Sequence, residues 1–321
     1  MKKILIIQTA FIGDVILATP LLEAIHTAYP DARLDMVVRK GNQSLFMGHP
    51  FLKTVFVWDK QGGKYKQLML LLVAIRRQKY DLVINCQRFA ASGFLTGFSG
   101  ATSTVGFSKN PLSFLFKVKV KHSISNGLHE CDRNLELLRH LNISGQAKPK
   151  LYPPTLTIEL KHPYVCMAPA SVWFTKQWPE HKWVELMQGI PAGTHVYLTG
   201  GPGDKALCER ILKESGRVEA ENFCGMLNLL ESAALMKGAA MNYVNDSAPM
   251  HLCSAVNAPV TAIFCSTVPS FGFGPLSDNS RIAEEKEHLA CRPCGLHGYK
   301  ACPKGHFKCA ETISIEQVLS A

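Results

Sequence analysis

The chain has 321 residues, of which 47% are apolar and 19% charged, and its mean hydropathy is +0.04. This balance is typical of a well-packed globular protein, it excludes a disordered or fibrous chain, and the length favours two domains over one. The formal charge of +10 favours partners that carry phosphate, such as a nucleotide, a nucleic acid or an anionic membrane surface, although a basic excess can also serve solubility alone.

The chain carries no segment that we interpret as a signal or a membrane span. No apolar run approaches the ~20 residues that a span requires. The start, MKKILII, imitates a secretory signal, but Gln8 and Asp14 interrupt the apolar region, so we predict a first strand there. Seven of the eleven cysteines share apolar surroundings: Cys86, Cys131, Cys166, Cys208, Cys224, Cys253 and Cys265. Scattered buried thiols are typical of a reducing compartment, and we expect a cytoplasmic protein.

The first half of the chain alternates short apolar strands with segments of helical period. We predict strands over 3–9, 33–39, 54–59 and 80–87 and helices over 15–29, 65–78 and 132–143. This rhythm implies an open parallel sheet with helices on both faces. A proline-rich stretch without helical period, 147–164, then breaks the rhythm and is the best candidate for a linker.

The same rhythm restarts after the linker. We predict strands over 164–170, 195–201, 241–246 and 259–265 and helices over 181–190, 204–215, 229–239 and 247–256. The expected fold is therefore α/β, with two doubly wound parallel-sheet domains over 1–152 and 153–321. In such an arrangement a ligand cleft forms where the carboxyl ends of the two sheets meet.

The segment NDSAPMHLCSA begins where one predicted strand ends and a helix starts. Asp246 or Ser247 can cap that helix, whose free N–H groups and dipole favour an anion. His251 follows Ser247 by about one turn and can reach the same ligand. On these residues alone, an ordinary helix cap beside a half-buried histidine is the commoner interpretation.

Two further strand-to-helix turns are suited to phosphate. In MAPASVWFTKQWPEHKW, the small residues around Ser171 allow close backbone approach, and Lys176 can neutralise a leaving diphosphate. A surface lysine before a helix explains the same pattern equally well. In LTGGPGDK, Gly200 and Gly201 form a glycine-rich turn that lacks both the full dinucleotide fingerprint and the Walker pattern.

Together, six segments resemble glycosyltransferase family 9, the ADP-heptose:lipopolysaccharide heptosyltransferases, in the same order and over nearly the whole chain. They are FIGDVILATPLL, HECDRNLELL, APASVWFTKQWP, LTGGPGD, NFCGMLNLLESAALM and NDSAPMHLCSA. The resemblance implies a GT-B fold and transfer of heptose from ADP-L-glycero-D-manno-heptose to an inner-core sugar of lipopolysaccharide. It also implies inversion at the anomeric carbon and a reaction that requires no metal cofactor.

The resemblance assigns roles to single residues. The catalytic base falls on Asp14 in the Gly13–Asp14 pair, and the diphosphate-contacting lysine falls on Lys176. Residues expected to bind the nucleotide sugar are Gly13, Ser171, Lys176, Gly200, Gly201, Asp246, Ser247, Ala248 and His251. Domain 1–152 is then expected to bind the acceptor and domain 153–321 the donor.

Two features of this sequence depart from the family pattern. Ala248 stands where some members carry glycine, and the loop APASVWFT is more apolar than the hydroxyl-rich loop of the family. The second departure leaves fewer side chains in that loop to contact phosphate.

Asp14 follows the first strand directly, at the mouth of a helix. The helix N-terminus is expected to lower its pKa and to keep the carboxylate ionised near neutrality. Such a weak base can still act if proton transfer runs late, once the attacking hydroxyl has become acidic. The competing interpretation is that Asp14 only caps its helix.

The segment 88–122 mixes six phenylalanines with Lys109, Lys117, Lys119 and Lys121. A surface of lysine and phenylalanine would suit a phosphorylated, lipid-linked sugar, and we expect peripheral contact with the inner face of the inner membrane. A core strand with solvated lysines explains the phenylalanine-rich half equally well.

Near the end of the chain, Cys291 and Cys294 form a CxxC pair, which Cys302 and Cys309 follow, with His297 and His306 among them. This spacing could complete a structural zinc site, and free thiols or a disulfide are the competing interpretations. In each case we expect the cluster to hold the segment after the last strand rather than to take part in transfer.

Two rival functions remain. One is a different nucleotide-sugar enzyme of the same fold, with another donor or acceptor, or an epimerase. The other is nucleic-acid binding through the +10 charge. We rank it low and expect no nucleic-acid partner, because the basic residues are spread along the chain and no recognised motif accompanies them.

Overall fold

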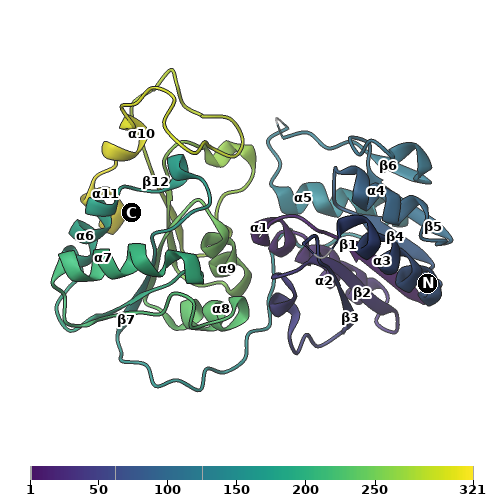
Figure 1. The fold of residues 1–321 in the computed structure, drawn as a ribbon, viewed down its shortest axis with the longest axis horizontal. Helices are drawn as coiled ribbons and strands as arrows, with labels where there is room; N and C mark the ends of the chain where they lie inside the picture. Colours follow the sequence, from purple (N-terminus) through teal and green to yellow (C-terminus); the bar gives the residue numbers. More distant parts are fainter. Residues whose placement is uncertain (1, 62, 125, 321) are drawn as a thin grey trace. The chain divides into compact units, whose positions relative to one another are not determined.

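Each half of the chain folds around a six-stranded parallel β-sheet. Figure 1 shows the ribbon of both halves, coloured along the chain. The computed structural model describes residues 2–61, 63–124 and 126–320. The chain divides into two compact units, Met1–Tyr152 (unit 1) and Pro153–Ala321 (unit 2). The predicted α/β class with two Rossmann-like sheets is confirmed.

Unit 1 has the strand order β3-β2-β1-β4-β5-β6. Its strands are β1 (Lys3–Ile7), β2 (Arg33–Arg39), β3 (Leu52–Trp58), β4 (Leu82–Asn85), β5 (Ser103–Phe107) and β6 (Val118–Val120). Its α-helices are α1 (Ile12–Ile16), α2 (Thr19–Ala28), α3 (Lys64–Gln78), α4 (Ala90–Gly97) and α5 (Glu130–Leu135). Three short 3-10 helices cover Gln43–Phe46, Ser113–Leu115 and Glu136–Leu141.

Side-chain alternation along β1 separates the two faces of this sheet. Leu5 and Ile7 belong to one buried cluster with the inner residues of α3 and with Leu95 of α4. Ile4 and Ile6, which alternate with them, are also buried and point to the opposite face. Both faces of β1 are therefore covered, which explains why its sequence is a continuous apolar run.

Unit 2 repeats the plan with the strand order β12-β11-β10-β7-β8-β9. Its strands are β7 (Tyr164–Ala168), β8 (His195–Leu198), β9 (Ala220–Asn222), β10 (Met241–Asn245), β11 (Val260–Phe264) and β12 (Ser280–Glu284). Its α-helices are α6 (Glu180–Gly189), α7 (Lys205–Ser215), α8 (Leu229–Gly238), α9 (Ala248–Val256), α10 (Lys308–Glu311) and α11 (Ile315–Ser320). The 3-10 helices cover Phe174–Lys176, Pro202–Asp204 and Pro269–Phe271.

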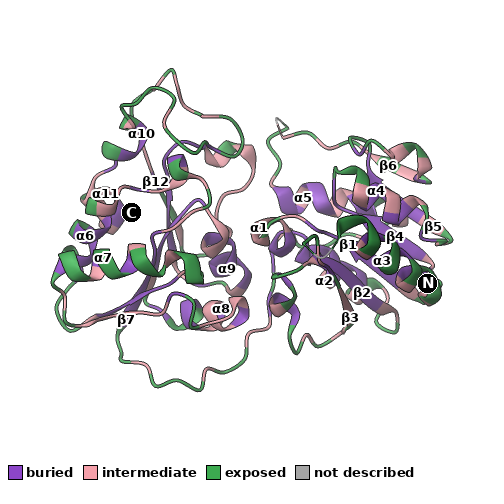
Figure 2. Cartoon of the chain, in the orientation of Figure 1, coloured by how far each residue is buried: buried purple, intermediate pink, exposed green. Residues whose placement is uncertain are grey.

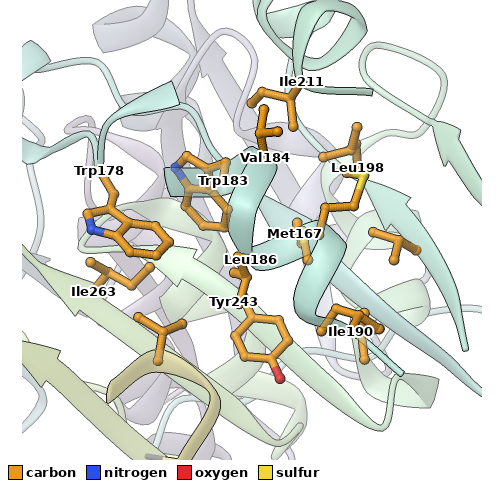
Figure 3. Packing of buried hydrophobic residues seen from close by; sticks show 14 of the residues in the cluster. Met167, Trp178, Trp183, Val184, Leu186, Ile190, Leu198, Ile211, Tyr243 and Ile263 are labelled. Atoms are coloured by element: carbon orange, nitrogen blue, oxygen red, sulfur yellow. The ribbon is translucent and has the colours of Figure 1, made fainter. Parts of the chain in front are cut away.

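The core on one face of this sheet forms between the strands and α6 and α7 (Figure 3). Met167 of β7 and Ile263 of β11 lie in it, together with Trp183 of α6. The rings of Trp178 and Trp183 meet edge to face, with centroids 5.5 Å apart. Because Trp178 closes the loop that carries Lys176, this core fixes one end of that loop.

The predicted helix over 15–29 is wrong in one respect, since the chain forms two helices there. Pro20 occupies the first turn of α2 and has no N–H to donate to the carbonyl of Ile16. The Thr19 hydroxyl donates to that carbonyl instead, at 2.7 Å. The helix that contains Asp14 is therefore only five residues long.

Other differences concern short elements. The predicted helix over 132–143 is α5 followed by a 3-10 helix over Glu136–Leu141. Four strands were not predicted, namely β5, β6, β9 and β12. Three of these lie at or next to a sheet edge and are short or partly exposed, so their sequences lack a long apolar run. In the part of the chain that the structure describes, no helix combines the length and apolarity that crossing a membrane requires.

Candidate active site

The candidate site residues follow the two central strands of each sheet, between which the direction of successive strand connections reverses. In unit 1 the reversal lies between β1 and β4, and in unit 2 between β10 and β7. Loops at the carboxyl ends of such neighbouring strands diverge and leave room for a ligand. Asp14 follows β1, Lys176 follows β7 and Asp246 follows β10.

Asp14 is held by a network of side-chain amides beneath its loop. Gln8, after β1, accepts a hydrogen bond from the Gln87 amide, after β4, at 2.7 Å, and another from the Ala10 N–H at 3.3 Å. The Asn42 amide donates to the Ala10 carbonyl at 3.1 Å. These bonds tie the end of β1 to its neighbours and fix the start of α1, where Asp14 occupies the first turn.

The pKa of Asp14 is raised to about 6, whereas the sequence led us to expect a lowered one. Burial is the largest cause, and the negative charge of Glu130 adds to it. The backbone N–H groups of Phe11 and Asp14 and the charge of Arg88 act in the opposite direction but do not prevail. A carboxylate with this pKa is still ionised at neutral pH and is a stronger base than an ordinary aspartate.

Glu130 belongs to a buried ionic network on α5. Its carboxylate accepts from Arg133 Nε at 2.7 Å and lies 3.1 Å from His122 Nε2. Lys109 Nζ lies 2.6 Å from the other ring nitrogen of His122. Burial opposes ionisation of Glu130, but His122 and Arg133 lower its pKa overall, so its charge persists and acts on Asp14.

In unit 2, Lys176 and Asp246 form a close ion pair, with Nζ 2.6 Å from Oδ2. The side chains are 15% and 7% exposed, respectively. The Thr267 hydroxyl donates to the same carboxylate oxygen at 2.5 Å. The structure thus brings together the lysine and the aspartate that the sequence placed in two separate motifs.

Asn245, the last residue of β10, closes the loop that carries Lys176. Its side-chain amide donates to the Pro169 carbonyl at 2.6 Å, and its side-chain oxygen accepts from the Trp178 N–H at 3.0 Å. One buried amide therefore holds both ends of the loop 169–178. From the sequence, Asn245 was expected only as a strand residue at the start of NDSAPMHLCSA, with no part in holding the Lys176 loop.

The cysteine-rich segment packs directly behind Lys176. Thr175 donates its N–H to the Tyr299 carbonyl at 3.1 Å, and its hydroxyl accepts from the Tyr299 N–H at 2.8 Å. A Cβ atom on Gly298 would lie 2.8 Å from the Thr175 hydroxyl and 3.1 Å from Lys176 Cγ. Gly298 has φ +78°, a conformation that favours glycine. The segment therefore supports the loop that presents the lysine.

Arg292 anchors this segment to the end of β11. Its guanidinium donates to the carbonyls of Phe264, Cys265 and Thr267 and forms an ion pair with Glu284 at 2.6 Å. These bonds satisfy carbonyl groups at and just beyond the end of β11, where the neighbouring strands no longer supply hydrogen-bond donors. They also fix Thr267, which contacts Asp246.

The remaining predicted residues lie on the same edge of this sheet. Ser171 accepts at its carbonyl from the Gln177 amide at 2.6 Å. Ser247 is the N-cap residue of α9, but its side chain does not cap the helix, and its hydroxyl instead donates to the Asn245 carbonyl at 3.4 Å. Ala248 begins α9, and His251 is buried within it. The capping role expected of Ser247 is therefore wrong.

Gly200 and Gly201 form a tight turn before α7. The Gly201 N–H donates to the Asp204 carboxylate at 2.8 Å. A Cβ atom on Gly200 would lie 2.9 Å from Asp204 and 3.0 Å from the Cys224 sulfur, so packing explains this glycine without a ligand. Gly13, by contrast, is a residue of α1, in unit 1.

The predicted zinc site receives no support. Among residues 2–61, 63–124 and 126–320, no group of three or more His, Cys, Asp or Glu side chains could hold a metal ion. Cys291, Cys294, Cys302 and Cys309 carry free thiols. The Cys291 sulfur lies 3.9 Å from His306 Nε2. The contacts of Arg292 and Gly298 attach this segment to the sheet.

Two hollows are found in unit 2. The larger, about 540 Å³, is lined by the proline-rich segment and by Tyr164 and Gly238. Tyr164 begins β7, so this hollow lies at the amino end of the strand, opposite the Lys176 loop. The smaller, about 230 Å³, is lined by residues that include Phe174, Gln177 and Trp178 and so adjoins that loop.

A family model, described as glycosyltransferase family 9 (heptosyltransferase), matches residues 69–299. The chain belongs to glycosyltransferase family 9. The predicted membership is thereby confirmed, and with it the prediction that the protein is a glycosyltransferase with a heptosyltransferase role.

Relatives of this family 9 member cover nearly the whole chain. It is 25% identical to lipopolysaccharide heptosyltransferase 1 of Pseudomonas aeruginosa over 91% of this chain and 86% of that protein. The family 9 glycosyltransferase structure from Veillonella parvula superposes with a TM-score of 0.86 at 21% identity, covering 100% of this chain and 96% of that one. The Escherichia coli ADP-heptose lps heptosyltransferase II gives 0.81 at 20% identity, over 100% and 97%. These two structures support the GT-B fold of the family 9 chain.

Proposed function

We propose that this family 9 enzyme transfers heptose from ADP-L-glycero-D-manno-heptose to an inner-core sugar of lipopolysaccharide, with inversion at the anomeric carbon. Unit 2 binds the nucleotide sugar, and unit 1 binds the acceptor. One observation carries the division of roles. The half-buried carboxylate of Asp14, with its raised pKa, follows the strand at the switch point of one sheet, and the cation, Lys176, follows that of the other.

The donor half of the proposal depends on the Lys176 loop. This loop is supported from behind by the hydrogen bond between Thr175 and the Tyr299 backbone and by the close packing of Gly298 against Thr175 and Lys176. A diphosphate at this loop competes with the Asp246 carboxylate for the same ammonium. Because the ion pair is largely buried, a second anion here gains more from Lys176 than it would in water.

The acceptor half depends on Asp14. As the acceptor hydroxyl oxygen attacks the anomeric carbon, its proton passes to the Asp14 carboxylate. The bond from the anomeric carbon to the diphosphate oxygen breaks, and its electron pair leaves with ADP. Lys176 stabilises the charge that develops on the departing phosphate. The proton transfer to Asp14 is general-base assistance, which is typically worth ~10² to 10⁴ in rate.

We further propose that the protein acts in the cytoplasm, at the inner face of the inner membrane, because the proposed acceptor is lipid-linked. No metal or other cofactor is assigned to the transfer step. Zinc at Cys291, Cys294, Cys302 and Cys309 is not proposed, since these cysteines do not form a metal-binding group in the described residues.

A panel of donors tests this function. Purified protein is incubated with ADP-, UDP- and GDP-linked sugars, with and without heptose-deficient lipopolysaccharide, and the products are analysed by mass spectrometry. We expect a mass gain of one heptose on the acceptor with ADP-heptose only. Transfer from a UDP- or GDP-sugar would overturn the donor assignment, and conversion of a sugar without any acceptor would support an epimerase instead.

A further inference from the structure

Helix α3 carries apolar side chains on its buried face and also on its exposed face. The inner face packs on the sheet of unit 1 through Leu68, Leu71, Leu72 and Ile75, which are 0–8% exposed. These four residues account for the helical period that the sequence shows. They leave the outer face free to carry polar residues, as in an ordinary surface helix.

That outer face is instead strongly exposed and apolar. Tyr65 is 78% exposed, Met69 50%, Leu70 55% and Val73 44%. At about 100° per residue, Tyr65, Met69, Val73 and Leu70 fall within one arc of roughly 140° on the helix surface, opposite the buried leucines. Figure 2 shows α3 coloured in large part as exposed. Single exposed apolar residues are normal, but a contiguous set on one element marks an interaction surface.

Basic residues flank these apolar side chains. The segment 60–79 contains no aspartate or glutamate, and its cations are Lys60, Lys64, Lys66, Arg76, Arg77 and Lys79. Lys64 and Lys66 lie in the first turn of α3, and Arg76 and Arg77 lie in the last. Arg76 also donates to the carbonyl of Phe98, another exposed aromatic residue, at 2.8 Å. The apolar patch therefore has a cationic group at each end.

We propose that this surface, the outer face of α3, docks on an anionic lipid bilayer. In this arrangement Tyr65, Met69, Leu70 and Val73 enter the interface, while the flanking lysines and arginines contact lipid phosphates. A helix with an apolar stripe and basic flanks is the form that binds anionic bilayer surfaces without spanning them. The biological purpose, delivery of a lipid-linked acceptor to unit 1, rests on the proposed function, but binding to lipid does not.

Charge argues against a second copy of the chain as the occupant. A two-fold contact would place the same patch against itself, and the cations at the two ends would face other cations. No acidic residue between 60 and 79 is available to compensate them. An anionic surface satisfies these cations, and another copy of the same helix does not.

Flotation of the full chain with lipid vesicles tests the proposal. The vesicles contain phosphatidylethanolamine with phosphatidylglycerol, or phosphatidylcholine alone. The double variant Met69→Gln/Leu70→Gln removes apolar contact, and Lys66→Gln/Arg77→Gln removes charge. The matched controls, Val218→Gln and Lys213→Gln, change residues of unit 2, where Val218 is 91% exposed.

We expect wild type to float with anionic vesicles at low salt and not with phosphatidylcholine. Each α3 double variant should lose binding by about tenfold or more, and the controls should bind as wild type does. All variants should keep the wild-type melting temperature and transfer to a lipid-free acceptor. Binding without any heptose transfer would overturn the proposed function but not this inference.

Three results would overturn the docking proposal. Failure of the wild type to float would remove the lipid partner. Flotation of both α3 variants as strong as that of wild type would assign lipid binding to another surface. A wild-type dimer in sedimentation that becomes monomeric in the apolar double variant would identify a second copy as the occupant.

Discussion

Lys176 Nζ lies 2.6 Å from Asp246 Oδ2, and the two residues follow neighbouring parallel strands, β7 and β10. This contact joins two motifs that are separated by much of unit 2 in the sequence. It places a carboxylate next to the cation that we propose binds the donor diphosphate. The balance between these two anions for Lys176 is the basis of the first prediction.

Replacing Lys176 by alanine should weaken ADP binding by roughly 10- to 100-fold, because a hydrogen-bonded charge contact is lost and Asp246 is left without its cation. Turnover should fall together with affinity. Calorimetric titration with ADP measures the first effect. Lys182→Ala, on the adjacent α6, is the matched control and should bind ADP normally. Unchanged affinity in Lys176→Ala would remove this lysine from the donor site.

Replacing Gly298 by alanine should lower both ADP affinity and transfer. The added methyl group would lie 2.8 Å from the Thr175 hydroxyl and 3.1 Å from Lys176 Cγ, so the loop must shift. Gly305→Ala is the matched control, since Gly305 has φ +73° and no atom within 4 Å of the added Cβ. Both variants share the backbone strain, and only the first disturbs Lys176. Equal losses of ADP affinity in the two variants would show that the segment does not position the lysine.

The pH dependence of transfer should report the pKa of Asp14. A general base must be ionised, so kcat/KM should rise with pH through about 6 and level off above it. Glu130→Gln removes a negative charge that raises this pKa, so the acid limb should move to lower pH. Glu136→Gln changes an exposed acid on the next helix and should leave the limb in place. An acid limb that moves to higher pH in Glu130→Gln, or that stays in place, would contradict the electrostatic coupling between Glu130 and Asp14.

Asp14→Asn should stabilise the folded protein at neutral pH. The folded pKa of about 6 exceeds the ordinary value of 3.8, so the folded state binds more protons between these values, and ionisation of Asp14 destabilises the fold as pH rises through them. The neutral variant avoids this loss, with a gain on the order of 2 kcal/mol above pH 6. The gain should shrink as pH falls from 6 toward 4. Urea unfolding at several pH values measures it, and a variant that is less stable at every pH would show that Asp14 serves mainly as a helix cap.

Much of the fold can be predicted from the sequence because parallel strands covered on both faces leave continuous apolar runs. The strand predicted over 33–39 matches β2 in both bounds, and that predicted over 241–246 differs from β10 by one residue. The break between α1 and α2 was missed, although Pro20 lacks the N–H that one continuous helix would need. Short edge strands such as β9 carry no such signal.

The site was less predictable, because its supporting contacts join residues far apart in the sequence. The charge that helps raise the pKa of Asp14 belongs to Glu130, and no local pattern links the two. The backbone of Tyr299 supports Thr175 in the same way, from a segment that the sequence analysis considered only for its cysteines. Local motifs therefore supplied the residues that we propose contact the substrate, whereas the residues that position them could be found only in the structure.

The role of Asp14 as the base is tested most sharply by comparing transfer and ADP binding in Asp14→Asn. We expect ADP affinity within about twofold of wild type, since Asp14 lies outside the Lys176 loop, and heptose transfer reduced by roughly 10² to 10⁴ at pH 7.5. Near-normal transfer by the asparagine variant would contradict the assignment of Asp14 as the base.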